Sequence, residues 1–171
     1  MGFVDAVDVV AGDQSVAMPF GNLAPRAPLH PAVSAGAEHR WLAGDHLALW
    51  QSARIGGHLH PIGGDALRLW TEAGGRATAG FGGLAEAGLD LGVAQIWRPR
   101  PVLAYDDGRW HEVPDAGRPA LTAGFGLGVG YGRGPVTVLL DYRWFAQVPF
   151  LPAVLAGPSA TLSAGIRWEL P

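Results

Sequence analysis

Apolar and polar residues alternate along most of the chain with a period of two. Between residues 121 and 131 every odd position is apolar, while the even positions hold Thr122 followed by four glycines. Residues 136–148 and 162–170 alternate in the same way. Successive side chains of a β-strand point to opposite faces, so each segment is predicted to be a strand with one apolar face. No long window shows helical spacing, and the pattern therefore predicts an all-β fold.

Eight segments of this kind follow one another along the chain. They cover residues 3–14, 31–42, 46–60, 65–76, 82–97, 119–132, 135–148 and 159–170. Short turns, such as Ala43-Gly44-Asp45 and Arg133-Gly134, alternate with longer connections. Membrane barrels alternate between short turns and long loops in this manner. The sequence predicts one domain, residues 1–171, folded as an eight-stranded antiparallel up-and-down transmembrane β-barrel.

The polar faces of the segments indicate which side of the sheet points into the barrel. They carry six acidic residues and six arginines, interleaved with glycine and serine: Glu38, Arg40, Arg54, Arg68, Glu72, Arg76, Glu86, Asp90, Asp141, Arg143, Arg167 and Glu169. Charges that can pair, with glycines to give them room, suit the narrow lumen of an eight-stranded barrel. The apolar faces are then expected to meet lipid. The alternative is a soluble, lipocalin-like carrier whose apolar face points inward.

Aromatic residues on the apolar face support the lipid-facing interpretation. They fall near the two ends of the segments and predict two girdles: Trp41, Tyr131 and Trp168 at the periplasmic rim, Trp97 and Trp144 near the opposite rim. Such belts flank the aliphatic band of outer-membrane barrels. Two further tryptophans, Trp50 and Trp70, occupy alternate strand positions whose side chains point into the lumen, which we call lumen parity. They are expected inside the barrel.

Composition excludes several other classes of protein. Apolar residues make up 49% of the chain and charged residues 16%, below the roughly 25% of soluble domains, so disorder is not expected. There is no cysteine for a disulfide or a thiolate metal site. The chain has 12 basic residues, all arginine, and 15 acidic ones, so no nucleic-acid partner is expected. No window supplies the about 20 apolar residues of a membrane helix, and Asp5 and Asp8 argue against a signal peptide.

With its eight alternating segments, the glycine–aromatic run 123–131 and the closing strand 160–170, the chain resembles the small outer-membrane β-barrel proteins of Gram-negative bacteria. The resemblance implies an outer-membrane location, termini toward the periplasm, and contact with outer-membrane lipid and the barrel-insertion machinery. Members usually end on an aromatic residue, whereas this chain ends Trp168-Glu169-Leu170-Pro171. Barrels of this kind have unrelated activities, so the fold does not give the function.

The sequence offers little for catalysis or metal binding. His58 and His60 share a strand face near the outer rim but have no carboxylate at close spacing, so neither a metal nor another cofactor is expected. Lipid A deacylases of the membrane use a histidine–serine pair on the lipid-facing wall, and the chain has no His-x-Ser element. His39 has lipid-facing parity, but no serine shares its face of that strand. We therefore expect no enzymatic activity.

The long connections are expected to form the extracellular surface. Residues 105–110, Tyr-Asp-Asp-Gly-Arg-Trp, form a turn sequence between short β-like runs and predict a hairpin standing above the barrel. With Ser15–Leu29 and Pro149–Ser159, it would meet any extracellular ligand. The function predicted is a non-enzymatic, structural or surface-binding membrane protein with a charged, mostly plugged lumen. The alternative for the lumen is a narrow pore for small solutes or ions.

Overall fold

The computed structural model of the chain describes residues 6–15, 31–59, 65–98, 102–148 and 157–170, the first of these ranges by its backbone alone. Within these ranges no helix is long and apolar enough to cross a membrane. The regular structure described consists of β-strands, as the period-two pattern predicts.

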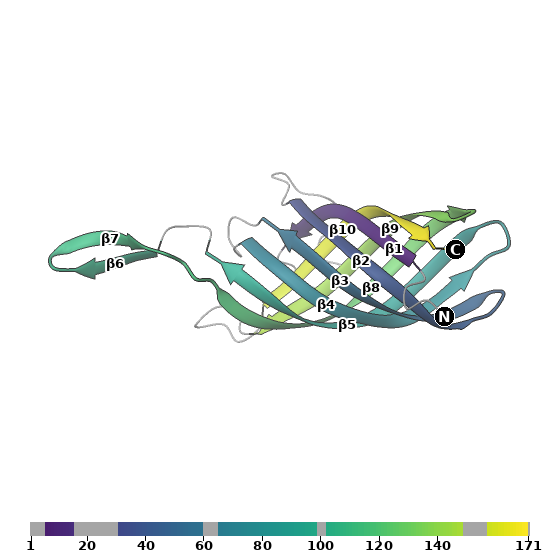
Figure 1. The fold of residues 1–171 in the computed structure, drawn as a ribbon, viewed down its shortest axis with the longest axis horizontal. Helices are drawn as coiled ribbons and strands as arrows, with labels where there is room; N and C mark the ends of the chain where they lie inside the picture. The colour runs from purple at the N-terminus through teal and green to yellow at the C-terminus, as the bar shows by residue number, and fades with distance from the viewer. Residues whose placement is uncertain (1–5, 16–30, 60–64, 99–101, 149–156, 171) are drawn as a thin grey trace.

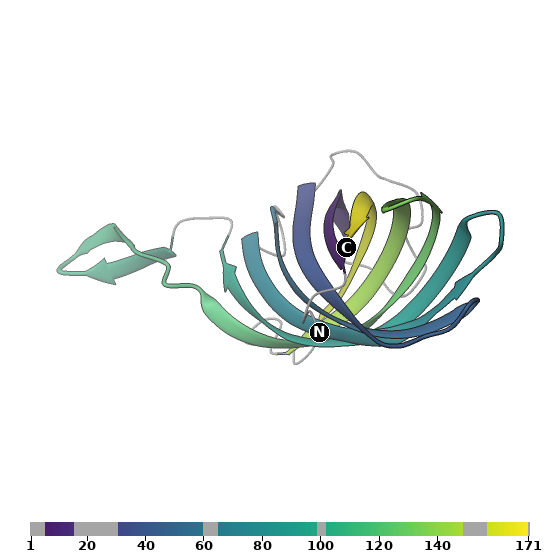
Figure 2. The ribbon, with the colours of Figure 1, turned by 45° about the vertical axis from the view of Figure 1, so that its right-hand side comes forward.

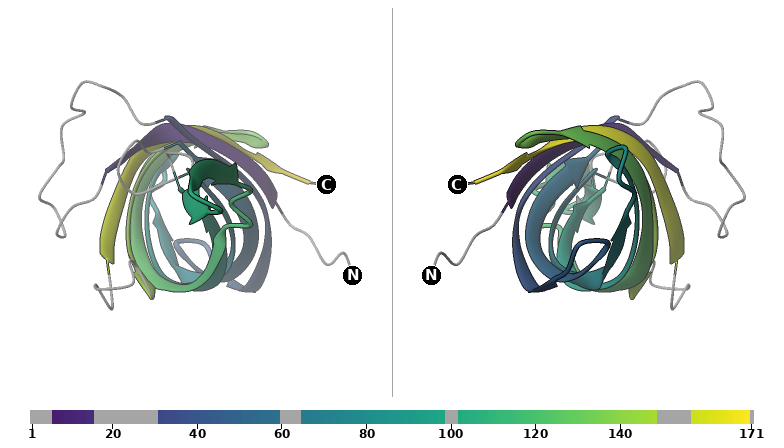
Figure 3. Two further views of the ribbon diagram at one scale, coloured as in Figure 1. Left: turned by 90° about the vertical axis from the view of Figure 1, so that its left-hand side faces the viewer. Right: turned by 90° about the vertical axis from the view of Figure 1, so that its right-hand side faces the viewer.

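Eight antiparallel strands close into one barrel (Figures 1 and 3). They are β1 (Ala6–Ser15), β2 (Pro31–Ala43), β3 (Leu47–His58), β4 (Asp65–Thr78), β5 (Gly83–Trp97), β8 (Arg118–Arg133), β9 (Val136–Val148) and β10 (Gly157–Glu169). Around the barrel the order is β1-β10-β9-β8-β5-β4-β3-β2, so β1 pairs with both β10 and β2. Closure leaves no exposed sheet edge, which a wall in contact with lipid requires.

The predicted segments and these strands agree closely. Residues 3–5 of the first predicted segment lie outside the described residues, and the other predicted ends differ from the strand ends by at most two residues. Neighbouring strands in the sequence pair with each other through turns at residues 44–46, 79–82 and 134–135. The start of β1 and the end of β10 lie at the same end as these turns (Figure 1). We call this the turn end of the barrel and the opposite one the loop end.

A two-stranded hairpin leaves the barrel at the loop end, between β5 and β8 (Figures 1 and 2). It consists of β6 (Val102–Asp106) and β7 (Arg109–Val113). At its tip Asp107 and Gly108 have φ angles of 48° and 74°. Two successive positive φ angles are the mark of a type I′ turn, which Asp-Gly favours. The hairpin predicted from residues 105–110 is therefore present.

The two faces of the sheet have opposite chemistry. Outward-facing residues are aliphatic and exposed, for example Leu89 at 73% and Leu121 at 66%. Their neighbours Asp90 and Thr122, at 2% and 3%, are buried inside. The outside is apolar and the inside carries the charges, as the sequence predicts for a membrane barrel. The alternative of a soluble carrier with an apolar interior is therefore wrong.

One polar pair lies on the outer wall. The Gln51 amide Nε2 donates to Thr71 Oγ1 at 3.2 Å, and Thr71 Oγ1 donates to the backbone oxygen of Ser52 at 3.0 Å. These bonds reduce the free-energy penalty of exposing polar groups to hydrocarbon.

Two local features depart from the simple alternation. The β2–β3 register shifts between Arg40 and Leu42, so Trp41 lies at a β-bulge. Tyr142 has outward parity yet is 7% exposed, because it packs in a cluster with Phe125, Trp144 and Leu162.

Candidate functional site

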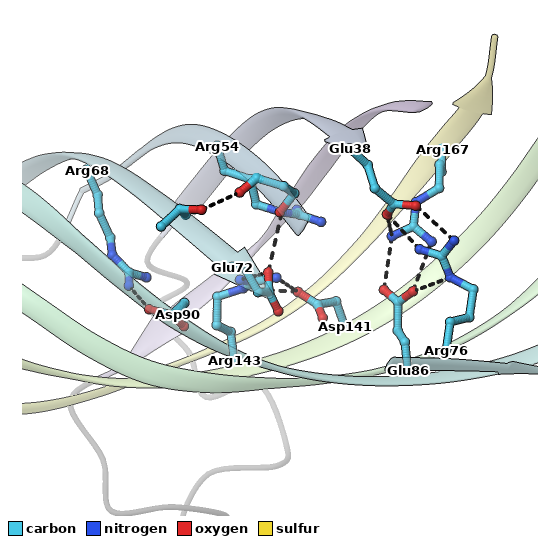
Figure 4. Close-up of polar contacts among 12 residues, drawn as sticks. Glu38, Arg54, Arg68, Glu72, Arg76, Glu86, Asp90, Asp141, Arg143 and Arg167 are labelled. Atoms are coloured by element: carbon cyan, nitrogen blue, oxygen red, sulfur yellow. Dashed lines mark hydrogen bonds and ion pairs between the residues drawn. The ribbon is translucent and has the colours of Figure 1, made fainter. Parts of the chain in front are cut away.

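The twelve predicted lumen charges divide into two groups along the barrel axis, and Figure 4 shows ten of them. The turn-side cluster contains Glu38, Arg40, Arg76, Glu86, Arg167 and Glu169. The central cluster contains Arg54, Arg68, Glu72, Asp90, Asp141 and Arg143. Among the side chains that the structure describes, each cluster has three arginines and three carboxylates, whose formal charges sum to zero.

The turn-side cluster is built around two carboxylates that two arginines share. Arg76 donates Nη1 and Nη2 to the two oxygens of Glu38, at 2.9 and 2.6 Å, and Nε to Glu86 Oε2 at 2.9 Å. Arg167 binds both oxygens of Glu86, at 2.9 and 3.0 Å. Planar guanidinium groups suit such two-point contacts. Because β10 and β5 are not neighbours in the sheet, Arg167 and Glu86 meet across the lumen.

The mouth of the turn-side cluster is partly open. Arg40 donates Nη2 to Glu169 Oε1 at 2.6 Å, and their side chains are 24% and 41% exposed. Next to them a hollow of about 260 Å³ extends into the turn end. This pair closes the network where the lumen meets solvent.

The central cluster binds strands that face each other. Arg143 of β9 donates Nη1 to Glu72 of β4 and Nη2 to Asp141 at 3.0 Å. Arg54 Nε lies 3.5 Å from the same Glu72 carboxylate. A carboxylate in a low-dielectric interior needs such partners, because burying it unpaired is strongly unfavourable.

The central cluster also rests on aromatic rings. Arg68 pairs with Asp90, donates Nε to Thr122 Oγ1 at 2.9 Å, and places its Cζ 4.7 Å from the Trp70 ring centre and 4.1 Å from that of Phe145. A guanidinium between two aromatic faces gains cation–π attraction in addition to its ion pair. Both tryptophans of lumen parity, Trp50 and Trp70, are buried.

Inward-facing glycines leave room for these side chains. A Cβ on Gly126 would lie 2.7 Å from Glu72 Oε1, and one on Gly128 would lie 2.8 Å from Glu86 Cγ. Gly88 on β5 is similarly crowded by Glu72. The sequence pattern suggests that strand glycines accommodate arginines, whereas in the structure the glutamates are the nearest neighbours at all three positions.

An apolar cluster lies inside the barrel toward the loop end. It consists of the buried residues Ala66, Ala94, Ile96 and Ala120, all of lumen parity. Sequence reasoning missed it, although apolar residues on an otherwise polar parity at strand ends were the available signal. Beside the central cluster, next to His58 and Trp70, a cavity has a volume of about 50 Å³. That volume suits a few water molecules and no larger ligand.

The predicted girdle residues lie at the strand ends. Three of them are more than half exposed on the outer wall toward the turn end: Trp41, Tyr131 and Trp168. The other two, Trp97 and Trp144, are partly buried toward the loop end. Trp144 stacks on Phe125 with ring centres 5.8 Å apart, which explains its smaller exposure.

At the loop end, the base of the β6–β7 hairpin is held by Asp115. Its carboxylate accepts the backbone N–H of Arg98 at 2.6 Å and that of Gly117 at 3.0 Å. These two hydrogen bonds, the first the larger, lower the pKa of Asp115, because they favour the charged form. Gln95 Nε2 adds a bond to the Ala116 carbonyl at 2.8 Å. These hydrogen bonds hold the base of the hairpin against the end of β5.

The hairpin itself has an aromatic face. Tyr105 and Trp110 are register partners with ring centres 5.2 Å apart, and they are 62% and 68% exposed. Leu103, two residues before Tyr105, is also exposed and lies on the same face. The predicted extracellular segments Ser15–Leu29 and Pro149–Ser159 lie largely outside the described residues.

The histidines do not assemble into a metal site in the described part of the chain. No group of three or more His, Asp or Glu side chains suited to a metal is found there. His58 is buried in the lumen, and His60 lies outside the described residues. His39 faces outward against Trp41, with ring centres 4.8 Å apart. In the strands with described side chains, the serines have lumen parity: Ser34, Ser52, Ser159 and Ser163.

Comparisons with known proteins identify solved structures that have a similar architecture. No protein-family model matches the sequence, and no curated protein sequence does. Among solved structures, Neisserial surface protein A aligns over 96% of this chain and 95% of that one, with a TM-score of 0.53 and 16% identity. The outer membrane enzyme PagL aligns over 96% and 99%, with a TM-score of 0.57 and 11% identity.

The fold is that of an outer-membrane β-barrel. The resemblance stated from the sequence is thereby confirmed at the level of the fold. Fold and apolar outer wall together place the barrel in the outer membrane of a Gram-negative bacterium, as the sequence predicts. At 16% and 11% sequence identity, the likeness shows a shared architecture and does not show a shared activity.

The ion pair between Arg68 and Asp90 gives a direct test of the central cluster. Arg68→Met leaves the Asp90 carboxylate, whose side chain is 0% exposed, without its cation, and we expect a loss of about 3–5 kcal/mol in unfolding free energy. The double variant Arg68→Met/Asp90→Leu should regain most of that loss. Arg109→Met at the hairpin tip is the matched control and should change stability by about 0.5 kcal/mol or less. Urea unfolding in detergent micelles measures all three, and equal losses in the single and double variants would contradict the pairing.

Proposed function

We propose that the protein is a non-enzymatic, surface-binding outer-membrane barrel whose plugged lumen serves as a rigid anchor for the β6–β7 hairpin. The observation that supports the proposal is that two clusters of paired charges lie inside the barrel. Arg143–Glu72 and Arg167–Glu86 join strands from opposite sides of the barrel, so the side chains occupy the space that a pore would need.

The charge balance favours a plug over a conduit. Channels and pores that select ions use rings of like charge, whereas each cluster here pairs three arginines with three carboxylates. The apolar cluster around Ile96 adds a barrier toward the loop end, and the space beside Trp70 is about 50 Å³. The narrow-pore alternative requires these side chains to move apart.

The non-enzymatic part of the proposal rests on the outer wall. One similar structure is that of an enzyme of the outer membrane, so catalysis is a real alternative. On the described wall His39 contacts Trp41, while the strand serines with described side chains have lumen parity. A histidine–serine pair on the lipid-facing side therefore has no support among these residues.

The surface-binding part rests on the hairpin. It projects from the loop end, its base is fixed by Asp115, and it presents Tyr105 and Trp110 side by side to solvent. Exposed tyrosine and tryptophan on a rigid element are typical anchors of binding surfaces.

Conductance in planar lipid bilayers tests the plug. The wild-type barrel is expected to give no discrete conductance steps, because the two clusters hold the lumen closed. Arg143→Ala removes the side chain that joins Glu72 and Asp141, and we expect it to produce steps. Arg109→Ala, on the hairpin, is the control and should behave as wild type. Steps from the wild-type protein would instead support the narrow pore.

Limited proteolysis of intact cells tests the display of the hairpin. Trypsin added outside should cut after Arg109, which is exposed at the hairpin tip, and Arg109→Gln should abolish that cut. Arg133 ends β8 beside the short turn at the opposite end and should be cut only after the outer membrane is opened. Cleavage after Arg133 in intact cells, with Arg109 protected, would reverse the proposed orientation.

A further inference from the structure

A hollow in the outer wall lies toward the turn end, over β3, β4 and β5. Besides outward-facing residues, its lining includes Ala48, Arg76 and Glu86, whose positions have lumen parity. It has a volume of about 540 Å³, within the usual range of ligand pockets. Its floor consists of small residues on two adjacent strands, Gly75 and Ala77 on β4 and Ala85 and Ala87 on β5. Figure 1 shows β3, β4 and β5 side by side on this part of the barrel. We call it the β4–β5 hollow.

Large side chains border this floor on both sides. Leu47 and Leu49 on β3 are register partners of Ala77 and Gly75, and both leucines are exposed. On the far side, Leu127 and Val129 of β8 pair with Ala87 and Ala85. From β3 to β8 there are three strand spacings of about 4.8 Å each, about 14 Å in all. The larger side chains of β3 and β8 therefore border a trough that a hydrocarbon chain can enter.

The trough is closed at one end and open at the other. Toward the middle of the barrel, Leu89 follows Ala87 on the outer face of β5 and is 73% exposed, so it blocks the trough. Toward the turn end, the exposed rings of Phe81 and Tyr131 flank the opening. The Gly132 N–H donates to the Gly82 carbonyl at 2.9 Å, which holds the β4–β5 turn against β8.

A cation lies just beyond this opening. Arg133 has the same outward parity as Val129 and Tyr131, and it lies four residues beyond Val129, about 13 Å at about 3.3 Å per residue. Arg133 is exposed, and among the described residues no carboxylate pairs with it. An apolar trough that ends at a free guanidinium matches a molecule with a hydrocarbon chain and an anionic head.

We propose that the β4–β5 hollow binds one phospholipid of the periplasmic leaflet, with an acyl chain in the trough and its phosphate on Arg133. The wall faces the bilayer, so lipid molecules surround this hollow and can enter it. Filling it recovers dispersion contacts that the small residues otherwise leave unmade. The phosphate gains a charge-assisted contact with arginine at the membrane surface.

Native mass spectrometry with added phosphatidylglycerol tests the proposal. The wild-type barrel should retain one lipid at detergent concentrations that remove the others. Gly75→Leu and Ala87→Leu fill the trough and should lose that lipid. A Cβ on Gly75 meets only Leu49 Cδ2 at 3.9 Å and the Ala48 carbonyl at 4.0 Å, so this change should leave the fold intact. Ala164→Leu, exposed on β10, is the control and should keep the lipid.

Arg133→Gln separates the headgroup contact from the trough. It should weaken retention of phosphatidylglycerol and remove the decrease in retention that added salt causes in the wild type. Equal retention by wild type, Gly75→Leu and Ala87→Leu would overturn the proposal. So would a dimer in the wild type that the filling variants abolish, because the occupant would then be a second copy of the chain.

Photo-crosslinking keeps the proposal testable even if a filling variant folds poorly. A phospholipid with a diazirine in its acyl chain, added to the unmodified barrel, should label residues 73–89 and 127–129 in preference to the rest of the wall. Uniform labelling around the barrel would contradict a specific site. Neither outcome depends on whether the lumen is plugged.

Discussion

Pairing of the buried charges, as seen for the described lumen side chains, is the constraint on which this barrel depends. Six arginines and six carboxylates share an interior where an unpaired charge would cost several kcal/mol. Arg167 with Glu86, and Arg143 with Glu72, join strands that are not neighbours in the sheet. These contacts exist only when the sheet is closed, so electrostatic pairing and backbone closure stabilise the same arrangement. The apolar side chains then lie on the outer wall.

The glycines of β8 are the structural counterpart of this network. Gly126 and Gly128 lie against Glu72 and Glu86, whose side chains occupy the space that other residues would fill. Strand glycines weaken a sheet. At these two positions the glycines leave room for glutamates whose charges are paired with arginines. The same barrel presents a tied hairpin at its loop end and a trough at its turn end. The hairpin and the trough both lie outside the lumen, and we propose a binding contact at each of them.

Parity along the chain was enough to predict the fold and the membership of the lumen. It assigned Trp50 and Trp70 to the inside, and it assigned Trp41 and Trp168 to the wall. It could not predict which arginine binds which carboxylate, because that depends on strand register and on distances across the closed barrel. It also missed the apolar cluster around Ile96, and it could not predict that Tyr142 on the outer face is buried against Phe125 and Trp144.

The central claim is that the apolar face meets hydrocarbon while the charged face is enclosed. The chain has no cysteine, so single cysteines can be introduced and spin-labelled one at a time. In lipid vesicles, labels at Val138 and Leu140 should be accessible to oxygen and protected from a water-soluble nickel complex, while labels at Thr137 and Leu139 should be protected from both. Nickel access at residues 138 and 140, with oxygen access at 137 and 139, would contradict the account.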